Sequence, residues 1–448
     1  MTPERRFGWT DGMLLALVVA AAAGARAGYL WACADSGRNG GPLLVQDRPA
    51  ELDALVRNLQ GQGRFAGPAP FAAGEEVTAH AAPGYPLFVS LLARLVDPAA
   101  RDSTVRWVQC GLGALTAGLY FLFARRVFGN PTVATLAGLF GAFHPFWVIN
   151  TAAVADGTLA TSLLALVLFL GVRAAQTGGP FESLLYGLAL ALLALVRAAL
   201  LPFAFVAVAW FLFRCRGLAR GWLCALLAFL GFANGLAPWM VRNFQLFREP
   251  VPVVDATYLH LWVGNNPLAD GGPLTDRMRA AAPTAELEKI PGQAERYARL
   301  GALVRQEVRD HPAEAVRRRL QAGLDFFFGA RWFQDGRLAE HASPGETAMP
   351  GWLARGYPVT LQAVLLALVL LGLLGWRWTY GWRFDMMPAT LAMIWVPLPY
   401  LLGHAEALSG PRLPLDGVLL CYAAFVLVSL VPGQGRDLLA GPPRPVSV

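Results

Sequence analysis

Two aspartates and three arginines stand at the ends of apolar segments in this 448-residue chain. Asp47 follows the first apolar segment, Asp156 opens a later one, and Arg197, Arg242 and Arg412 lie at the ends of three others. Charged side chains at a membrane boundary are costly unless they are paired or functional. Arginine can hold a phosphate through two hydrogen bonds, and a carboxylate can take the proton of a hydroxyl group. The set therefore predicts a site for a reaction on an anionic lipid.

Each of these residues also has a purely structural interpretation. Asp47 and Asp156 are well placed to cap the helices that follow them. The three arginines could instead extend toward lipid headgroups. His80 is more often an ordinary loop histidine than a ligand. No HExxH, P-loop, GxGxxG or GxSxG motif occurs in a suitable context, and no metal-ligand spacing stands out, so we expect neither a metal nor a cofactor.

The composition excludes an ordinary soluble protein, because 56% of the residues are hydrophobic and only 15% are charged. About 20 apolar residues are needed to cross a bilayer. The hydropathy pattern predicts an all-α polytopic membrane protein with about ten transmembrane helices, near 11–33, 104–124, 131–149, 157–174, 183–197, 198–214, 219–240, 357–376, 386–403 and 413–432. Ionisable residues collect at the ends of these spans, which disfavours a transporter.

Arginines in the short loops orient the chain. Ten spans with the N-terminus and C-terminus inside make nearly every short inside loop basic. The outside then receives two long hydrophilic segments. The predicted units are an N-terminal transmembrane module at 1–240 with a catalytic first outside loop at 34–103, a second outside region at 241–356, C-terminal helices at 357–432 and a disordered cytoplasmic tail at 433–448.

The outside segments contain helices of their own. Apolar residues recur at helical spacing in 51–59, which predicts a helix lying in the interface plane. The segment 84–96 is apolar but short, and predicts a second helix at the membrane surface. Two amphipathic helices broken near Pro312 are expected between 285 and 322, followed by a loop over 331–351 that could order around a ligand.

Two other classes of protein fit poorly. The net charge of +7 comes from arginines scattered singly through short loops, without a basic stripe interleaved with aromatic residues, so we expect no nucleic-acid binding. The five cysteines form no CxxC pair and lie mostly in or beside apolar segments, which favours small helix residues over a disulfide or metal framework.

Eight short segments, in order along the chain, resemble the glycosyltransferase C superfamily, and in particular the bacterial family-39-type enzymes related to protein O-mannosyltransferases and to the aminoarabinose transferase of lipid A. The segments are ELDALVRNL at 51–59 after Asp47, APGYPLF at 82–88, ARRVFG at 124–129, HPFWVINTAAVADGTL at 144–159, ALVRAALLP at 194–202, APWMVRNFQLF at 237–247, LWVGNNP at 261–267 and PRLPLD at 411–416.

The resemblance implies a multispan fold with catalytic loops outside, in the bacterial cytoplasmic (inner) membrane with the active site facing the periplasm. The donor would be a polyprenyl-phosphate monosaccharide, and the acceptor a protein, lipid or glycan. Asp47 would be the base of an inverting displacement, and Asp156 would orient donor or acceptor. The resemblance also places a set of further residues at the substrate: His80, Tyr85, Arg197, Arg242, Asn243, Asn265 and Arg412.

Two departures from the family pattern leave alternatives open. The first acid lacks the usual D-x-x-x-Y or D-E pattern, so Glu51 or Asp53 could be the base in place of Asp47. The usual tyrosine before the final arginine is absent, because Gly410 and Pro411 precede Arg412. A polyprenyl-lipid or solute transporter (a flippase) and a non-catalytic assembly protein on the same fold are the competing hypotheses.

Overall fold

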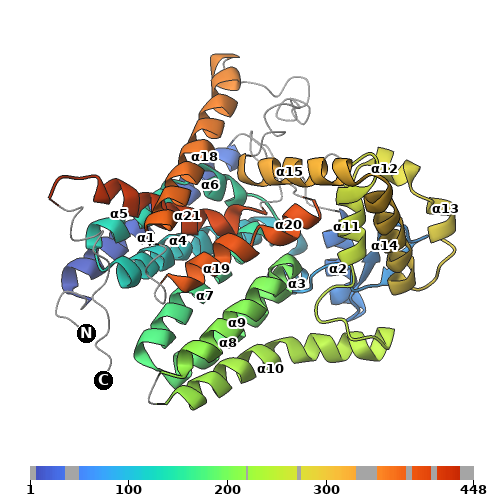
Figure 1. The fold of residues 1–448 in the computed structure, drawn as a ribbon, viewed down its shortest axis with the longest axis horizontal. Coiled ribbons are helices and arrows are strands. Elements are labelled where there is room, and N and C mark those ends of the chain that lie inside the picture. The colour runs from blue at the N-terminus through green and yellow to red at the C-terminus, as the bar shows by residue number, and fades with distance from the viewer. Residues whose placement is uncertain are drawn as a thin grey trace.

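The computed structural model describes residues 7–35, 50–217, 220–269, 274–328, 351–379, 386–404 and 411–433. Most of this part of the chain is helical (Figure 1). Three features of the sequence prediction lie outside it. They are Asp47, the loop over 331–351 apart from its last residue, and the tail over 433–448 apart from its first.

The first half of the chain forms a helical bundle. Its members are α1 (Trp9–Asp35), α4 (Arg101–Phe128), α5 (Pro131–Phe143), α6 (Pro145–Thr151), α7 (Gly157–Thr177), α8 (Pro180–Val196), η3 (Ala198–Leu200), α9 (Leu201–Cys215) and α10 (Gly221–Phe247). By length and hydropathy, five helices of the described chain could each cross a membrane, or six if α5 and α6, bent by 48° at His144, form one span.

The C-terminal half adds α18 (Gly351–Thr379), α19 (Met387–Trp395), α20 (Leu398–Leu402) and α21 (Leu413–Ser429). The four remaining predicted spans coincide with shorter apolar helices over 180–196, 366–379, 387–402 and 413–429. All ten predicted segments are therefore helical. The number of crossings and their orientation stay predictions.

Local residue chemistry sets the tight turns between these helices. Gly129 ends α4 in the left-handed conformation (φ 69°), which glycine adopts without a steric penalty. The Asn130 side chain then caps α5 by accepting from the backbone N–H groups of Thr132 and Val133, and Pro131 occupies the first helical turn. Gly178 ends α7 in the same way (φ 63°) before Pro180 begins α8. These turns make α4 and α5, and α7 and α8, consecutive helix pairs.

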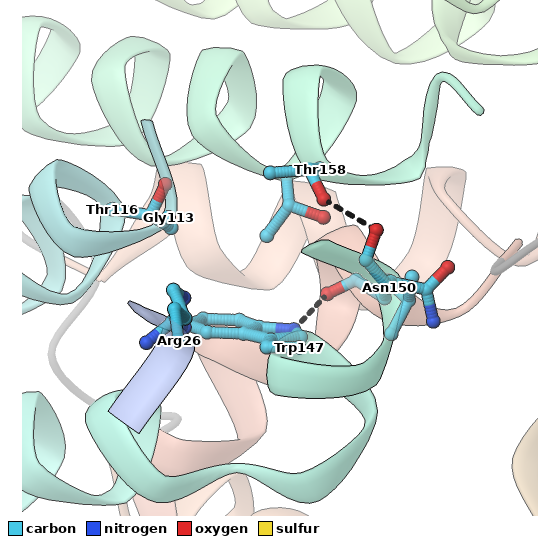
Figure 2. Close-up of a pocket in the computed structure, with 8 residues that line it drawn as sticks. Arg26, Gly113, Thr116, Trp147, Asn150 and Thr158 are labelled. Atoms are coloured by element: carbon cyan, nitrogen blue, oxygen red, sulfur yellow. Dashed lines mark hydrogen bonds between the residues drawn. The ribbon is translucent and has the colours of Figure 1, made fainter. Parts of the chain in front are cut away.

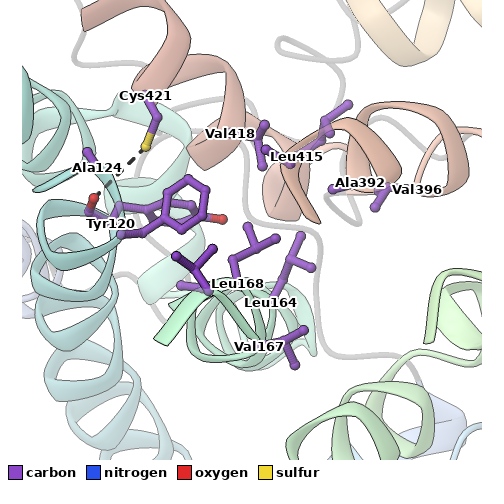
Figure 3. Close-up of a cluster of buried hydrophobic side chains, with 14 of the residues drawn as sticks. Tyr120, Ala124, Leu164, Val167, Leu168, Ala392, Val396, Leu415, Val418 and Cys421 are labelled. Atoms are coloured by element: carbon purple, nitrogen blue, oxygen red, sulfur yellow. Dashed lines mark hydrogen bonds between the residues drawn. The ribbon is translucent and has the colours of Figure 1, made fainter. Parts of the chain in front are cut away.

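One continuous apolar core joins the two halves of the bundle. Figure 3 shows Tyr120 and Ala124 of α4, Leu164 and Leu168 of α7 and Val418 of α21 around one buried volume. Small residues allow other helices closer approach. A Cβ on Gly187 of α8 would lie 1.9 Å from the Ala228 carbonyl oxygen of α10, so those two backbones touch directly.

Within the described residues, the two segments predicted to lie outside form ten elements. They are α2 (Ala50–Gly61), β1 (Ala66–Pro68), β2 (Glu75–Val77), α3 (Gly84–Ala93), η2 (Pro98–Ala100), α11 (Thr257–Asn265), α12 (Asp276–Ala281), α13 (Thr284–Leu287), α14 (Gln293–Asp310) and α15 (Pro312–Phe328). In Figure 1, α11, α12, α13 and α14 lie together at the right of the view. The helices predicted at 51–59 and 84–96 and the break at Pro312 are confirmed. The all-α prediction is wrong in one detail, because β1 and β2 form an antiparallel hairpin.

Arg26 contradicts the expectation that ionisable residues collect only at span ends. It lies within α1 and is fully buried. Its guanidinium donates to the carbonyl oxygens of Ala22 (3.0 Å), Ala142 (3.0 Å) and Gly141 (3.1 Å), of which the last two belong to the final turn of α5. Carbonyls at a helix C-terminus lack intrahelical partners and carry partial negative charge, so Arg26 joins α1 to α5.

A small enclosed cavity lies beside Arg26, with a volume of about 10 Å³. Trp147 of α6 forms one wall of the cavity and faces the polar side chains of α4 and α7 (Figure 2). Thr116 and Thr158 contribute hydroxyl groups to its wall. A cavity of this size is at the lower limit for one water molecule, so this region is part of the packed interior.

Candidate functional site

Asp156 and Arg197 form a two-point ion pair at one end of the bundle. Arg197 Nε donates to Asp156 Oδ2 (2.7 Å) and Arg197 Nη2 donates to Asp156 Oδ1 (2.6 Å). Asp156 occupies the N-cap position of α7 but makes no capping hydrogen bond. Arg197 follows the last residue of α8. Because α7 and α8 are consecutive and run in opposite directions, the start of one and the end of the other meet, and the capping interpretation of Asp156 is wrong.

The pair is only partly shielded from solvent. The Arg197 side chain is 8% exposed, whereas the Asp156 side chain is 27% exposed. Arg197 also hydrogen-bonds Tyr400 of α20, which must accept because guanidinium nitrogens only donate. The arrangement fixes the guanidinium plane from two sides and leaves the carboxylate as its accessible member.

The turn before Asp156 is held by buried polar groups. Tyr85 of α3 donates its hydroxyl hydrogen to Gln109 Oε1 of α4 (3.0 Å). The other end of the Gln109 amide donates to the carbonyl oxygens of Thr151 (3.1 Å) and Ala153 (2.7 Å). Tyr85, which the resemblance placed at the substrate, therefore supports the 151–156 backbone through Gln109.

A second pair, between a glutamate and a histidine, joins α2 to the segment before α3. Glu51 Oε1 lies 2.7 Å from His80 Nε2. His80 Nδ1 lies 2.6 Å from the Thr78 hydroxyl oxygen, and that hydroxyl lies 2.8 Å from Gln293 Oε1 of α14. Glu51 keeps 37% of its side chain exposed and His80 only 6%. The two segments predicted to lie outside thus meet in one hydrogen-bonded chain of Gln293, Thr78 and His80.

Asp53 lies in different surroundings from Glu51. It forms an ion pair with Arg101 at the start of α4 (3.1 Å). Asp53 lines an open depression of about 670 Å³ together with Arg57, Gln60, Gly61 and Arg101. At 100° per residue, positions 53, 57 and 60 fall on one face of α2, while Glu51 falls on the buried side with Leu55. The two alternative acids therefore point to opposite sides of the same helix.

The Glu51–His80 and Asp156–Arg197 pairs belong to one region. A Cβ on Gly84 would lie 2.8 Å from the backbone nitrogen of Val196, the residue before Arg197. His80 precedes Gly84 by four residues, which can span at most about 14 Å. Leu52 of α2 also shares a hydrophobic cluster with Val154, two residues before Asp156.

Arg242 and Asn243 bind protein backbone at the end of α10. Arg242 Nη1 donates to the Thr78 carbonyl oxygen (2.9 Å) and Nη2 donates to that of Phe65 (3.2 Å), while the Trp239 ring lies 4.6 Å from the guanidinium carbon. Asn243 is fully buried and donates to the Val251 carbonyl oxygen (3.0 Å). Arg242 therefore holds the first of the two segments predicted to lie outside, and Asn243 holds the start of the second.

Asn265 and Arg412 likewise have intramolecular partners. The Asn265 side chain donates to the carbonyl oxygens of Leu261 (2.6 Å) and Leu402 (3.3 Å). Arg412 is 8% exposed and donates to Asp416 (2.7 Å) one turn later in α21. Asp416 also lies 3.6 Å from the buried His144. None of the three predicted arginines, Arg197, Arg242 and Arg412, extends alone toward the headgroups.

The carboxyl group of Asp255 and the phenol of Tyr297 lie near the Glu51–His80 pair. Burial, with a contribution from Glu249, raises the pKa of Asp255 to about 6. Burial also raises the pKa of Tyr297 well above its usual range, and the nearby carboxylates of Glu76, Glu51 and Asp255 raise it further. The Tyr297 hydroxyl is buried and has no hydrogen-bond partner within the described ranges. Tyr297 therefore remains a neutral phenol with its hydroxyl available.

Sequence reasoning missed Thr78, Gln293, Tyr297 and Tyr400. Thr78 and Gln293 are 215 positions apart, so no local spacing relates them. The described residues include no group of three or more His, Cys, Asp or Glu side chains able to hold a metal ion. The chemistry available to these side chains is proton transfer and binding of anionic groups.

Comparisons with known protein families and structures relate these residues to a family. The sequence model of the family described as dolichyl-phosphate-mannose-protein mannosyltransferase matches residues 80–241, a stretch that includes His80, Asp156 and Arg197. No curated protein matches the chain at a significant level.

Solved structures share the fold. An apo oligosaccharyltransferase from Archaeoglobus fulgidus is similar, with a TM-score of 0.52, 15% identity, and coverage of 98% of this chain and 53% of that one. The oligosaccharyltransferase AglB from the same organism, in complex with an inhibitory peptide and a dolichol-phosphate, is also similar. Its TM-score is 0.51 at 13% identity, and the match covers 94% of this chain and 50% of that one. This chain therefore spans about half the length of those proteins.

ArnT from Cupriavidus metallidurans bound to undecaprenyl phosphate is matched over 96% of this chain and 84% of that one at 15% identity, but its TM-score of 0.34 is too low to support an argument. The archaeal fold and the matched residues 80–241 together confirm the resemblance of this chain to the glycosyltransferase C superfamily.

Proposed function

We propose that this protein is a membrane glycosyltransferase that moves a sugar from a polyprenyl-phosphate donor to an acceptor at the outer face of a bacterial inner membrane. The observation that carries the proposal is the Asp156–Arg197 pair at the meeting point of α7 and α8, within the residues that match the mannosyltransferase family. The names of the similar proteins support a lipid-phosphate donor, since one of them holds a dolichol-phosphate.

The reaction is an inverting displacement at the anomeric carbon. A carboxylate of the first outside segment accepts the proton of the acceptor hydroxyl, with Asp47 as the first candidate and Glu51 and Asp53 as its alternatives. Asp156, held by Arg197, orients the donor or the acceptor. The departing lipid phosphate acquires negative charge, and guanidinium groups near the site stabilise that charge. Arg197 acts in this proposal through Asp156, because its guanidinium is already bonded to that carboxylate and to Tyr400.

The other predicted substrate residues have supporting roles in this proposal. Tyr85, Arg242, Asn243 and Asn265 act through the backbone and side chains that they hold. Arg412 would reach a lipid phosphate only by leaving Asp416. These residues are therefore expected to affect the stability of the site more than the chemical step.

The experiment is a transfer assay with purified full-length protein in nanodiscs and radiolabelled polyprenyl-phosphate monosaccharides. Membrane extracts supply the acceptor. Loss of label from the lipid fraction and its appearance on a new product supports the proposal, provided that Asp156→Asn abolishes it. Movement of intact labelled lipid across the bilayer without cleavage would identify a flippase instead. If the labelled lipid is neither cleaved nor moved across the bilayer, the result would favour a non-catalytic assembly protein.

A further inference from the structure

The hydrogen-bond network behind Glu51 determines where the hydrogens lie. Gln293 Nε2 donates to the Asp255 carbonyl oxygen (3.3 Å), so the oxygen of the same amide faces Thr78. The backbone N–H of Ala79 donates to that oxygen (3.2 Å), which independently fixes the amide orientation. The Thr78 hydroxyl at 2.8 Å must therefore donate its single hydrogen to Gln293 Oε1.

This use of the Thr78 hydrogen fixes the tautomer of His80. With its hydrogen committed to Gln293, the Thr78 oxygen can only accept from its other neighbours. One neighbour is the backbone N–H of His80 (3.0 Å) and the other is His80 Nδ1 (2.6 Å). Nδ1 must therefore carry a hydrogen, because two lone pairs at that distance would repel each other.

The opposite nitrogen of the ring then faces Glu51. His80 Nε2 lies 2.7 Å from Glu51 Oε1. The Nε2–Oε1 distance is that of an ion pair, and Nε2 makes no hydrogen bond of ordinary geometry to a described residue. The buried His80 ring therefore limits the position of the Glu51 carboxylate through close contact at Oε1.

The other polar and charged groups near the pair come from α10, β2, α14 and the segment before α11. Arg242 of α10 donates to the Thr78 carbonyl oxygen (2.9 Å). Glu76 of β2 is bound by Arg296 of α14 through two hydrogen bonds (2.9 and 3.1 Å). Asp255 precedes α11, and Tyr297 of α14 presents its buried hydroxyl without a partner among the described residues. Arg296 is thus paired with Glu76, and His80 is the side chain in direct contact with Glu51.

We propose that Glu51 is the base that accepts the acceptor proton, and that His80 is its positioning residue, held in turn by Thr78 and Gln293. This rests on the proposed function. In the step, the acceptor hydroxyl hydrogen passes to Oε2 of Glu51 and the acceptor oxygen bonds the anomeric carbon. The bond from that carbon to the phosphate oxygen breaks, and its electron pair leaves with the lipid phosphate. Asp53 faces the opposite side of α2 with Arg101 as its partner, so this geometry selects Glu51 among the described acids.

The first test compares transfer rates of five variants in the nanodisc assay. Glu51→Gln should lower turnover by about 10²–10⁴-fold, the usual contribution of a general base. His80→Gln keeps a side-chain nitrogen beside Glu51 Oε1 and should therefore retain turnover within about tenfold. His80→Leu removes this contact and should lower turnover by about 10- to 150-fold, the worth of one polar contact to a charged group. Glu51→Gln combined with His80→Leu should lose little more than Glu51→Gln alone. Glu75→Gln, an equally small change on the exposed hairpin, is the control.

Thermal unfolding of each variant in the same nanodiscs shows whether a loss of turnover is a loss of folding. Wild-type turnover in Glu51→Gln, with loss in Asp47→Asn or Asp53→Asn, would overturn the assignment while leaving the proposed function intact. Absence of transfer by wild-type protein with every donor would remove the proposed function and the base together.

The hydrogen network has a readout that requires no activity. In protein labelled with ¹⁵N-histidine, the signal missing from His80→Gln identifies His80. We expect Nδ1 of that residue to carry a hydrogen in wild-type protein, and we expect this preference to be lost in Thr78→Val. An ordinary mixture of tautomers in wild-type protein would overturn the positioning role of His80, whatever the transfer assay shows.

Discussion

Arg197 donates hydrogen bonds from Nε and Nη2 to the two carboxylate oxygens of Asp156, at 2.7 and 2.6 Å, where the end of α8 meets the start of α7. At the other end of the same two helices, Arg173 faces Glu182 at 3.2 Å. The Arg173 side chain is 41% exposed, against 8% for Arg197. One helix pair therefore carries a buried two-point ion pair at one end and an exposed ion pair at the other.

This contrast supplies a matched test of the Asp156–Arg197 pair. Arg197→Lys retains the charge but cannot make the two parallel hydrogen bonds, so we expect transfer to fall by at least about tenfold, the effect of about 1.4 kcal/mol. Arg173→Lys should stay close to wild type, because exposed pairs contribute about 0–1 kcal/mol. Steady-state transfer rates measure both. Equal losses in the two variants would remove the special role of the buried pair.

The packing of Arg26 against α4 predicts a strong response to a single methyl group. A Cβ on Gly113 would lie 2.4 Å from Arg26 Nε, whereas a Cβ on Gly111 would meet nothing within 4 Å. Gly113→Ala should therefore destabilise the protein by about 1–3 kcal/mol, as overpacking does. Gly111→Ala should be neutral or stabilising by up to about 1 kcal/mol, because alanine is the better helix former. Unfolding midpoints in detergent distinguish the two, and a Gly113→Ala variant as stable as Gly111→Ala would contradict the buried position of Arg26.

The Glu76–Arg296 bridge ties the hairpin to α14 and should contribute to stability. Arg296 is 3% exposed and Glu76 23%. Arg296→Met removes two hydrogen bonds from the partly exposed Glu76 carboxylate, which we expect to cost about 1–3 kcal/mol. The control is Arg299→Met, one turn along α14, where the pair with Glu286 is about half exposed on both sides. It should cost about 1 kcal/mol or less. The assay is thermal unfolding, and equal midpoints for the two variants would argue against the bridge.

Asp255 predicts a pH-dependent stability of definite sign. Burial raises the pKa of its carboxyl to about 6 in the folded state, from about 3.9 in an unfolded chain. The folded state therefore binds this proton more tightly than the unfolded state. The resulting stability is fully present below about pH 4 and is lost as the pH rises to about 6.

Asp255→Asn should remove this component. The decrease in the unfolding midpoint that Asp255 causes as the pH rises from about 4 to about 6 should then disappear. At pH 7 the variant should be at least as stable as wild type. Asp310→Asn, at the exposed end of α14, should leave the pH profile unchanged. A wild-type pH profile in Asp255→Asn would show that another group is responsible.

Hydropathy and helix signals located most elements because they are local properties of the chain. Every predicted span is a helix, the break at Pro312 falls where its missing N–H and fixed φ require it, and the helices predicted at 51–59 and 84–96 are present. Arg26 was missed because a single arginine barely changes the mean hydropathy of a long apolar stretch. The β1–β2 hairpin was missed because each strand has only three residues.

The sequence by itself determined the helical membrane class, the acids and arginines at the helix ends and the resemblance to the glycosyltransferase C superfamily. Tertiary structure alone decided which of these side chains face one another. Asp156 looked like a helix cap until the end of α8 brought Arg197 within 2.7 Å. Glu51 and Asp53 are two residues apart in sequence yet lie on opposite sides of α2, one at His80 and the other at Arg101. The physical reason is that apolar periodicity acts between neighbours in the chain, whereas polar pairing depends on which helix ends the packed bundle brings together.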